Sequence, residues 1–131
     1  MYMLDTNICI YIIKKRPPSF LEKFHAVKKN SLCISVITYA ELQYGVERSS
    51  SKKKNQFILT DFVSLLTVLS WDMDAARHYG KIRSDLKKKG TPIGNMDLLI
   101  AAHALSQKCT LVSNNLREFK RIKDLRQENW E

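Results

Sequence analysis

The sequence predicts an α/β domain in which helices cover both faces of a mostly parallel sheet, giving three layers. The first observation is that short apolar runs alternate with longer stretches whose apolar residues recur at helical spacing. The second is that strands separated by helices along the chain favour parallel pairing. The third is the composition of the 131 residues, 44% hydrophobic and 27% charged, which is ordinary for a globular protein. We therefore expect one domain over residues 1–131.

The first half of the chain is predicted to contain two strands and four helices. A β-branched run, "LCISVI", favours a buried strand, and "RPP" (16–18) is expected to stop the first helix. Ser19 and Glu22 have the spacing of a capping box at the start of the second helix. The expected elements are, in order, a strand at 2–4, helices at 8–15 and 19–29, a strand at 32–37, and helices at 38–47 and 54–66.

The second half continues the alternation of strand and helix. Asp72 or Asp74 is expected to cap a long helix that Gly90 ends, since glycine commonly follows the last helical residue. The expected elements are a strand at 67–70, the long helix up to 89, a helix at 96–106, a strand at 109–113, a short helix at 116–122 and a tail ending in "ENWE".

The sequence points to the cytoplasm. No apolar stretch approaches the roughly 18 residues of a membrane span, and "MYMLDTN" has none of the regions of a signal peptide. The three cysteines, Cys9, Cys33 and Cys109, are isolated among apolar neighbours and form no metal or redox motif. We expect them to be buried thiols in a reducing compartment, with no membrane partner.

An excess of basic residues suggests a polyanionic partner. Lysines and arginines outnumber the acids by 22 to 13, which gives a formal net charge of +9. Such a surface suits nucleic acid or an acidic protein. The lysine runs at 52–54 and 87–89 either contact such a partner or are solvated helix faces and ends, and the sequence leaves both interpretations open.

Four acids are placed where they can converge. Asp5 ends the first strand, Glu41 lies in the first turn of the helix after the second strand, Asp97 starts a helix, and Glu118 follows the last predicted strand. In open α/β sheets, binding sites form outside the carboxyl ends of the strands. Residues remote in sequence are therefore expected to meet there.

Each acid also has an explanation as part of a helix start. Asp5 can cap the next helix, and Asp97 sits where the helix dipole favours negative charge. Two spacings, Thr38 with Glu41 and Asn115 with Glu118, match capping boxes. These explanations do not account for burial, because "LLIAAHAL" is apolar nearly all round and should bring Asp97 deep into the protein.

A buried carboxylate needs a positive partner, and "TPIGNM" before Asp97 offers none. Mg²⁺ or Mn²⁺ prefers oxygen ligands and relieves the repulsion between clustered carboxylates. The three histidines, His25, His78 and His103, lack the spacing of a zinc pair and are expected to be packing or surface residues. A carboxylate-bound metal in a basic protein predicts phosphodiester hydrolysis.

Four segments resemble a known family. "MLDTN", "ITYAELQYG", "GTPIGNMDLLIAAHAL" and "LVSNNLREFKRI", followed by "NW", occur in the order found in the PIN-domain ribonucleases that are the toxins of VapBC toxin–antitoxin modules. The resemblance covers nearly the whole chain and implies a PIN-like fold. It also implies that Asp5, Glu41 and Asp97 form an acidic Mg²⁺ site, with Mn²⁺ as an alternative ion.

The resemblance further implies substrates and partners. Members of the family cut RNA, structured RNAs such as tRNA among them. They are usually homodimers that a cognate antitoxin holds inactive, and they form higher assemblies with antitoxin and operator DNA.

The chain departs from the family pattern at one position. Many PIN domains carry a fourth acid after the last strand, where this chain has Asn115. Glu118 can substitute for it as a catalytic acid, which leaves open whether one or two metals bind. Side chains beside the acids are expected to contact substrate or metal-bound water, namely Thr6, Asn7, Ser113, Asn114 and Asn115.

Two other functions were compared with this one. A haloacid-dehalogenase-type phosphatase also has an aspartate after its first strand, but it needs a second aspartate where this chain has Asn7. A non-catalytic basic module that binds nucleic acid or a partner protein would explain the charge but not the acids. EDTA discriminates between the ribonuclease and such a binding module, since it should abolish metal-dependent cleavage and leave simple binding unchanged.

Overall fold

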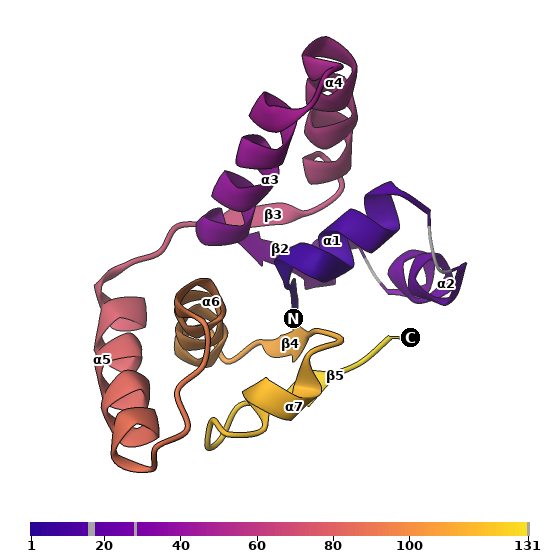
Figure 1. Cartoon of the computed structure of the whole chain (residues 1–131). Helices are drawn as coiled ribbons and strands as arrows, with labels where there is room; N and C mark the ends of the chain where they lie inside the picture. The colour runs from indigo at the N-terminus through magenta and orange to yellow at the C-terminus, as the bar shows by residue number, and fades with distance from the viewer. Residues whose placement is uncertain (16–17, 28, 131) are drawn as a thin grey trace.

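The computed structural model describes residues 1–15, 18–27 and 29–130 (Figure 1). Its centre is a five-stranded sheet in the order β3-β2-β1-β4-β5, and every neighbouring pair is parallel. The strands are β1 (Tyr2–Leu4), β2 (Leu32–Ser35), β3 (Thr67–Leu69), β4 (Thr110–Val112) and β5 (Gln127–Glu128). The predicted α/β class is confirmed.

Helices connect these strands. They are α1 (Thr6–Ile13), α2 (Pro18–Ala26), the short 3-10 helix η1 (Lys29–Ser31), α3 (Val36–Arg48), α4 (Lys52–Val63), α5 (Met73–Lys88), α6 (Asn95–Ser106) and α7 (Leu116–Phe119). Among the residues described, no helix combines the length and apolar character that crossing a membrane requires.

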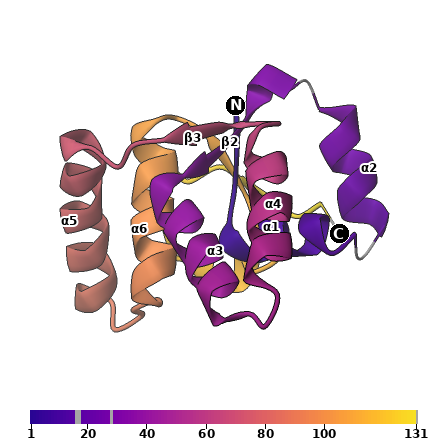
Figure 2. The same ribbon diagram turned by 90° about the horizontal axis from the view of Figure 1, so that it is seen from above.

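Successive strand residues pack into two hydrophobic clusters, one on each face of the sheet. Met3 and Cys33 pack with buried residues of α5, α6 and α7, whereas the adjacent Leu4 and Ile34 pack with those of α1, α2, α3 and α4. Figure 2 shows α5 and α6 on one side of the strands and α1, α2 and α4 on the other. Because both faces are covered, the central strands β1, β2 and β4 are largely apolar, as parallel strands usually are.

The strand order reverses at β1. The chain moves outward from β1 to β2 and β3, and then returns to place β4 on the opposite side of β1. A hydrogen bond from the N–H of Asp5 to the carbonyl of Val112 (3.0 Å) joins the carboxyl ends of these two strands. Ligands of open α/β sheets bind at such a reversal. Asp5 therefore lies where a site is expected.

Five helices, α1, α2, α3, α4 and α6, begin one or two residues earlier than the sequence suggested. The capping box at Ser19 is wrong, because α2 already includes Pro18, and proline suits the first helical position. The strand predicted to reach residue 37 stops at Ser35, whose Oγ accepts a hydrogen bond from the N–H of Ile37 (3.1 Å) and so caps α3. Short apolar runs in strands and in buried helices look alike, which explains the misplaced boundary.

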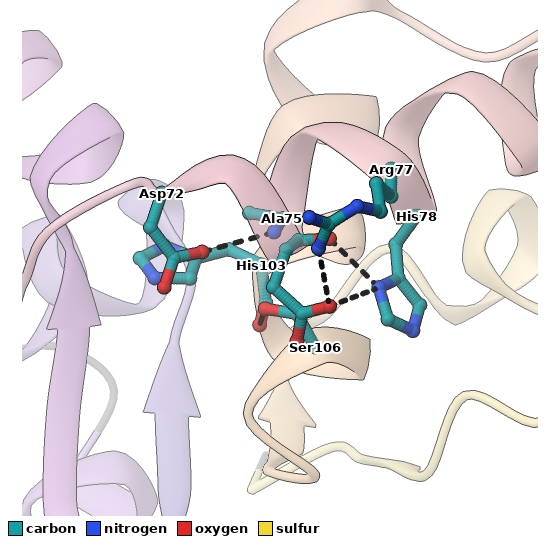
Figure 3. A network of polar contacts seen from close by, with 7 residues as sticks. Asp72, Ala75, Arg77, His78, His103 and Ser106 are labelled. Carbon is teal, nitrogen blue, oxygen red and sulfur yellow. Dashed lines mark hydrogen bonds and ion pairs between the residues drawn. The ribbon is translucent and has the colours of Figure 1, made fainter.

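The long helix ends as predicted at both termini. The carboxylate of Asp72 accepts a hydrogen bond from the N–H of Ala75 (3.0 Å), as Figure 3 shows. Gly90 adopts a left-handed φ of 68°, its N–H bonds to the carbonyl of Lys87, and the N–H of Thr91 bonds to that of Leu86. These two bonds form a Schellman motif, which favours glycine at the left-handed position.

The remaining differences concern the ends of segments. Residues 16, 17 and 28, in the "RPP" stop and the predicted 19–29 helix, lie outside the described residues, as does residue 131 of the tail. The sequence analysis missed β5, because two polar residues carry no strand pattern. The strand exists through its pairing with β4, in which Leu111 lies opposite Gln127.

The prediction of buried thiols is confirmed. All three cysteines are free and buried. The sulfur atoms of Cys33 and Cys109 lie 4.0 Å apart between β2 and the start of β4, and burial raises the pKa of Cys9. These residues act as small apolar side chains of the core.

Candidate active site

Asp5 is both a helix cap and a member of an acidic cluster. Its carboxylate accepts a hydrogen bond from the N–H of Ile8 (2.9 Å), and only 3% of the residue is exposed. Burial raises the pKa of Asp5 to about 6, although hydrogen bonds from Ser113 and Ile8 lower it, and the charges of Asp97 and Glu41 raise it further. The capping explanation therefore holds without excluding a site.

Asp97 is not the cap of its helix. Gly94 occupies the N-cap position without a side-chain bond, and Asp97 is the third residue of α6. The expectation of deep burial is wrong for this turn: Met96 is 50% exposed and Asp97 is half-buried, since complete burial begins at Leu98.

The pKa of Asp97 is raised by partial burial first and by the charges of Glu118 and Glu41 next, while a hydrogen bond from Asn115 lowers it. The acids on α3, α6 and α7 therefore act on one another electrostatically. The charges of both Glu118 and Glu41 therefore act on Asp97.

Glu41 lies inside α3 and takes no part in a capping box. The helix begins at Val36, so Thr38 is an interior residue and is fully buried. Glu41 instead accepts a hydrogen bond from the hydroxyl of Thr6 (2.5 Å), which also lies 3.4 Å from the hydroxyl of Thr38. The first residue of α1 therefore orients the half-buried carboxylate of α3.

Asn115 connects two acids. Its side-chain nitrogen donates to Oε2 of Glu118 (3.1 Å) and lies 3.5 Å from Oδ2 of Asp97. Asn115 does occupy the N-cap position of α7, but its side chain makes no capping bond, so the predicted capping box is absent. The amide of Asn115 therefore links the carboxylates of Glu118 and Asp97.

Ser113 and Asn114 have hydrogen-bond partners within the protein, whereas Asn7 is exposed. Ser113 is fully buried, bonds to the carboxylate of Asp5 and accepts the N–H of Asn115 at 2.9 Å. Asn114 donates to the hydroxyl of Tyr11 (3.1 Å). Asn7 is exposed at the rim of a groove that Glu41 also lines. Of these three, Asn7 is the one left open to solvent.

His103, which was predicted to be a packing or surface residue, is packed against the start of α3. His103 is fully buried, and its Nδ1 lies 2.7 Å from Oγ of Ser35, the cap of α3. The contact joins α6, which carries Asp97, to α3, which carries Glu41. Figure 3 places His103 beside the start of α5, where His78 contacts Asp74, whereas His25 is exposed on α2.

Gly45 lies on α3 one turn after Glu41. A Cβ at this position would meet nothing within 4 Å, so packing does not require glycine. Gly45 lines a different cavity, formed with α1 and α4.

The cluster suits a hard divalent cation in its charge and donor atoms. None of the ion pairs found among residues 1–15, 18–27 and 29–130 involves Asp5, Glu41, Asp97 or Glu118. Carboxylate oxygens are the donors that Mg²⁺ prefers. Within the described ranges, however, no three acidic, histidine or cysteine side chains already form a ready-made metal group, so these carboxylates must approach one another to share an ion.

The chain is similar to known proteins over nearly its whole length. The family model described as PIN domain matches residues 2–125. The chain is 48% identical to Ribonuclease VapC2 of Rickettsia felis over 132 residues, covering 100% of this chain and 98% of that protein. It is 45% identical to the tRNA(fMet)-specific endonuclease VapC of Shigella flexneri over 129 residues, covering 98% and 97%.

Solved structures show the same fold in complexes. The structure of VapBC2 from Rickettsia felis bound to a promoter DNA fragment matches with a TM-score of 0.93 and 46% identity, over 99% of this chain and 98% of that one. DNA-bound VapBC from Salmonella typhimurium matches with a TM-score of 0.92 and 46% identity, over the same shares. The chain therefore belongs to the PIN-domain family, among the VapC ribonucleases.

Proposed function

We propose that this chain is a Mg²⁺-dependent endoribonuclease that hydrolyses phosphodiester bonds of structured RNA, such as tRNA, as the toxin of a type II toxin–antitoxin system. The observation that carries the proposal is the convergence of Asp5, Glu41, Asp97 and Glu118 near the sheet reversal, where none of them forms an ion pair with a cation of the described residues. PIN-domain nucleases generally need a divalent metal, and Mn²⁺ would suit the same oxygen donors.

Asp5, Asp97 and Glu41 would hold the ion, which supplies Lewis-acid polarisation of the phosphate and a more acidic water. The protein's own contribution is to orient the carboxylates. Ser113 and the N–H of Ile8 both bond to Asp5, and Thr6 bonds to Glu41. Hydrogen bonds of this kind fix the rotamers of metal-binding side chains.

The proposed substrate and partners rest on the net charge of the chain and on its relatives. The net charge of +9 suits RNA, and the relative from Shigella flexneri is named for cutting tRNA(fMet). We assign a cognate antitoxin to this chain because its structural relatives are VapBC complexes, some of them bound to DNA. A homodimer that assembles with antitoxin on operator DNA in the cytoplasm is part of the same proposal.

We assign antitoxin binding to a cavity of about 340 Å³ between α1, α3 and α4. Apolar residues such as Ile10, Leu42 and Leu59 line it, and Lys14 and Lys54 lie at its margin. An apolar segment flanked by acidic residues would fit this combination of surface and charge.

The proposed activity is tested by incubating the purified chain with total RNA in Mg²⁺ or in EDTA and mapping the cleaved ends. Attack by water should leave 5′-phosphate and 3′-hydroxyl ends and should stop in EDTA. Cyclic phosphate ends would indicate attack by the 2′-hydroxyl and would contradict a metal mechanism. RNA binding that survives EDTA without cleavage would identify a non-catalytic module instead.

Of the two lysine runs, the second is the one that we assign to RNA contact. Lys87 and Arg83 line a groove of about 530 Å³ together with Asn95, two residues before Asp97. By contrast, Lys52 at the start of α4 pairs with Glu47 at 3.7 Å, and both side chains are well exposed. We therefore expect the groove beside α6 to contact the RNA backbone.

Replacing Arg83 and Lys87 together with serine should reduce the salt dependence of RNA binding. Each lost phosphate contact lowers the log–log slope by about 0.7 on single strands, so the pair should lower it by about 1.4. Fluorescence anisotropy in EDTA at several salt concentrations measures this slope. The matched variant Lys52→Ser/Lys53→Ser should retain the parental slope, and the reverse result would assign RNA contact to α4.

A further inference from the structure

An apolar groove runs beside the acidic cluster between α3 and α6. Its volume is about 570 Å³, and its lining includes Ile37, Tyr44, Met96 and Leu99. Glu41 and Thr6 line the same groove, so it reaches the acidic cluster at Glu41. The groove is thus an apolar extension of an acidic site.

Two large side chains stand unusually open to solvent in this groove. Tyr44 is 63% exposed and Met96 is 50% exposed, although both border a surface that is otherwise apolar. The guanidinium group of Arg48 lies 5.6 Å from the centre of the Tyr44 ring, one turn further along α3. An open aromatic face, a polarisable thioether and an adjacent cation therefore occur together within reach of Glu41.

We propose that this groove receives an unpaired nucleobase of the RNA next to the cleaved phosphate, with the base stacked on Tyr44. The inference rests on the proposed ribonuclease function and specifies the substrate further. A base is neutral and flat, so it can lie beside carboxylates that would repel a phosphate, while Arg48 can attract the attached backbone. Asn7 at the rim offers an amide to the edge of the base.

The geometry favours single-stranded or looped RNA over a continuous duplex. A paired base is stacked between its neighbours and can enter a pocket only after it is unpaired and unstacked. Stacking on an aromatic ring tolerates any base, because every base has a π-face. The groove therefore selects an unpaired nucleotide rather than a particular sequence.

The test uses an oligoribonucleotide that contains a mapped cleavage site, with abasic substitutions at each nucleotide flanking the cut. For the parent protein, one abasic position should lower kcat/KM by about five- to a hundredfold. Tyr44→Ala should lose a similar factor on intact RNA and should show no further loss with the abasic RNA. Tyr44→Phe keeps the ring and should behave as the parent.

Phe57→Ala is the matched control, since Phe57 is 74% exposed on α4 and does not line the groove. It should cleave intact and abasic RNA as the parent does. Cleavage of intact RNA by Tyr44→Ala at the parental rate would overturn the nucleobase subsite and leave the ribonuclease function standing. Independent, multiplicative losses from Tyr44→Ala and the abasic position, accompanied by a change in oligomeric state, would assign the groove to a second copy of the chain.

Binding in EDTA separates this proposal from the proposed function. Anisotropy should show that Tyr44→Ala and the abasic substitution weaken binding by similar, non-additive factors even when nothing is cleaved. If the parent cleaves no RNA yet shows this pattern, the subsite stands and the hydrolytic function falls. If it cleaves RNA without the pattern in either assay, the subsite falls alone.

Discussion

Replacing Asp97 with asparagine is expected to abolish RNA cleavage while leaving the fold intact. The side chain caps no backbone group of α6, so asparagine removes charge rather than a structural bond. The loss of a favourable helix-dipole interaction, about 0.3–1 kcal/mol, is opposed by relief of repulsion from Glu118 and Glu41. Cleavage should fall by more than about a hundredfold, the upper end of what the loss of an outer metal-site partner costs.

The matched control for this variant is Asp74→Asn. Asp74 is also an acid in the first turn of a helix, but it lies on α5 and pairs with Arg77 (3.6 Å). Its replacement should leave cleavage at the parental level. Thermal unfolding and single-turnover cleavage of both variants are the measurements. An Asp97→Asn protein that is less stable but cleaves normally per folded molecule would restrict Asp97 to helix stabilisation.

The second large effect is expected from Asp5→Asn, which should be inactive and more stable than the parent in the absence of metal. Asparagine keeps the cap of α1, since its side-chain oxygen can accept the N–H of Ile8. The rise in the pKa of Asp5 from 3.8 to about 6 corresponds to roughly 3 kcal/mol of destabilisation of the charged form. The variant does not carry this charge, so it should unfold several degrees higher at pH 7.5 in EDTA.

The pH dependence gives the sign of this effect. Between about pH 4 and 6, the folded parent binds a proton at Asp5 that the unfolded chain has released, so its stability falls as the pH rises through this window. The stability difference between variant and parent should therefore grow from pH 4 to pH 7 and then level off. Urea unfolding across this range measures it, and a pH-independent difference would contradict the buried, proton-binding carboxyl.

The α/β class was predictable because it depends on patterns that local residues express. The cap at Asp72 and the left-handed Gly90 were also predictable, since each follows from backbone chemistry within one turn. The start of α3 was misplaced because the apolar run 32–37 continues from strand into helix, and only tertiary packing decides where it changes. Strand β5 depends entirely on its pairing with β4 and carries no signal of its own.

The acids of the candidate site were predictable from the sequence, but the hydrogen bonds that hold them in place were not. Asp5, Glu41 and Asp97 stand out as acids near the ends of strands or the starts of helices. The bond from Thr6 to Glu41 spans 35 positions, and the contact between Ser35 and His103 spans 68. Pairings of that sequence separation depend on the sheet order, which a single sequence does not specify.

The groove at Tyr44 was also beyond the sequence. The residue lies in the "ITYAELQYG" segment, where an aromatic side chain on a helix normally indicates a core position. Its 63% exposure follows from the orientation of α3 relative to α6, which is a property of the assembled fold.

The central claim is that Asp5, Asp97 and Glu41 bind a divalent cation, and a Mn²⁺-soaked crystal tests it most directly. Manganese has an anomalous signal that identifies the ion without reference to activity, and it accepts the same carboxylate donors as Mg²⁺. The account predicts an anomalous peak about 2.0–2.6 Å from carboxylate oxygens of Asp5 and Asp97, with Glu41 directly bound or bound through water. Crystals of Asp97→Asn soaked in parallel should lose the peak. A parental crystal with ordered Asp5, Glu41 and Asp97 carboxylates and no peak between them would contradict the account.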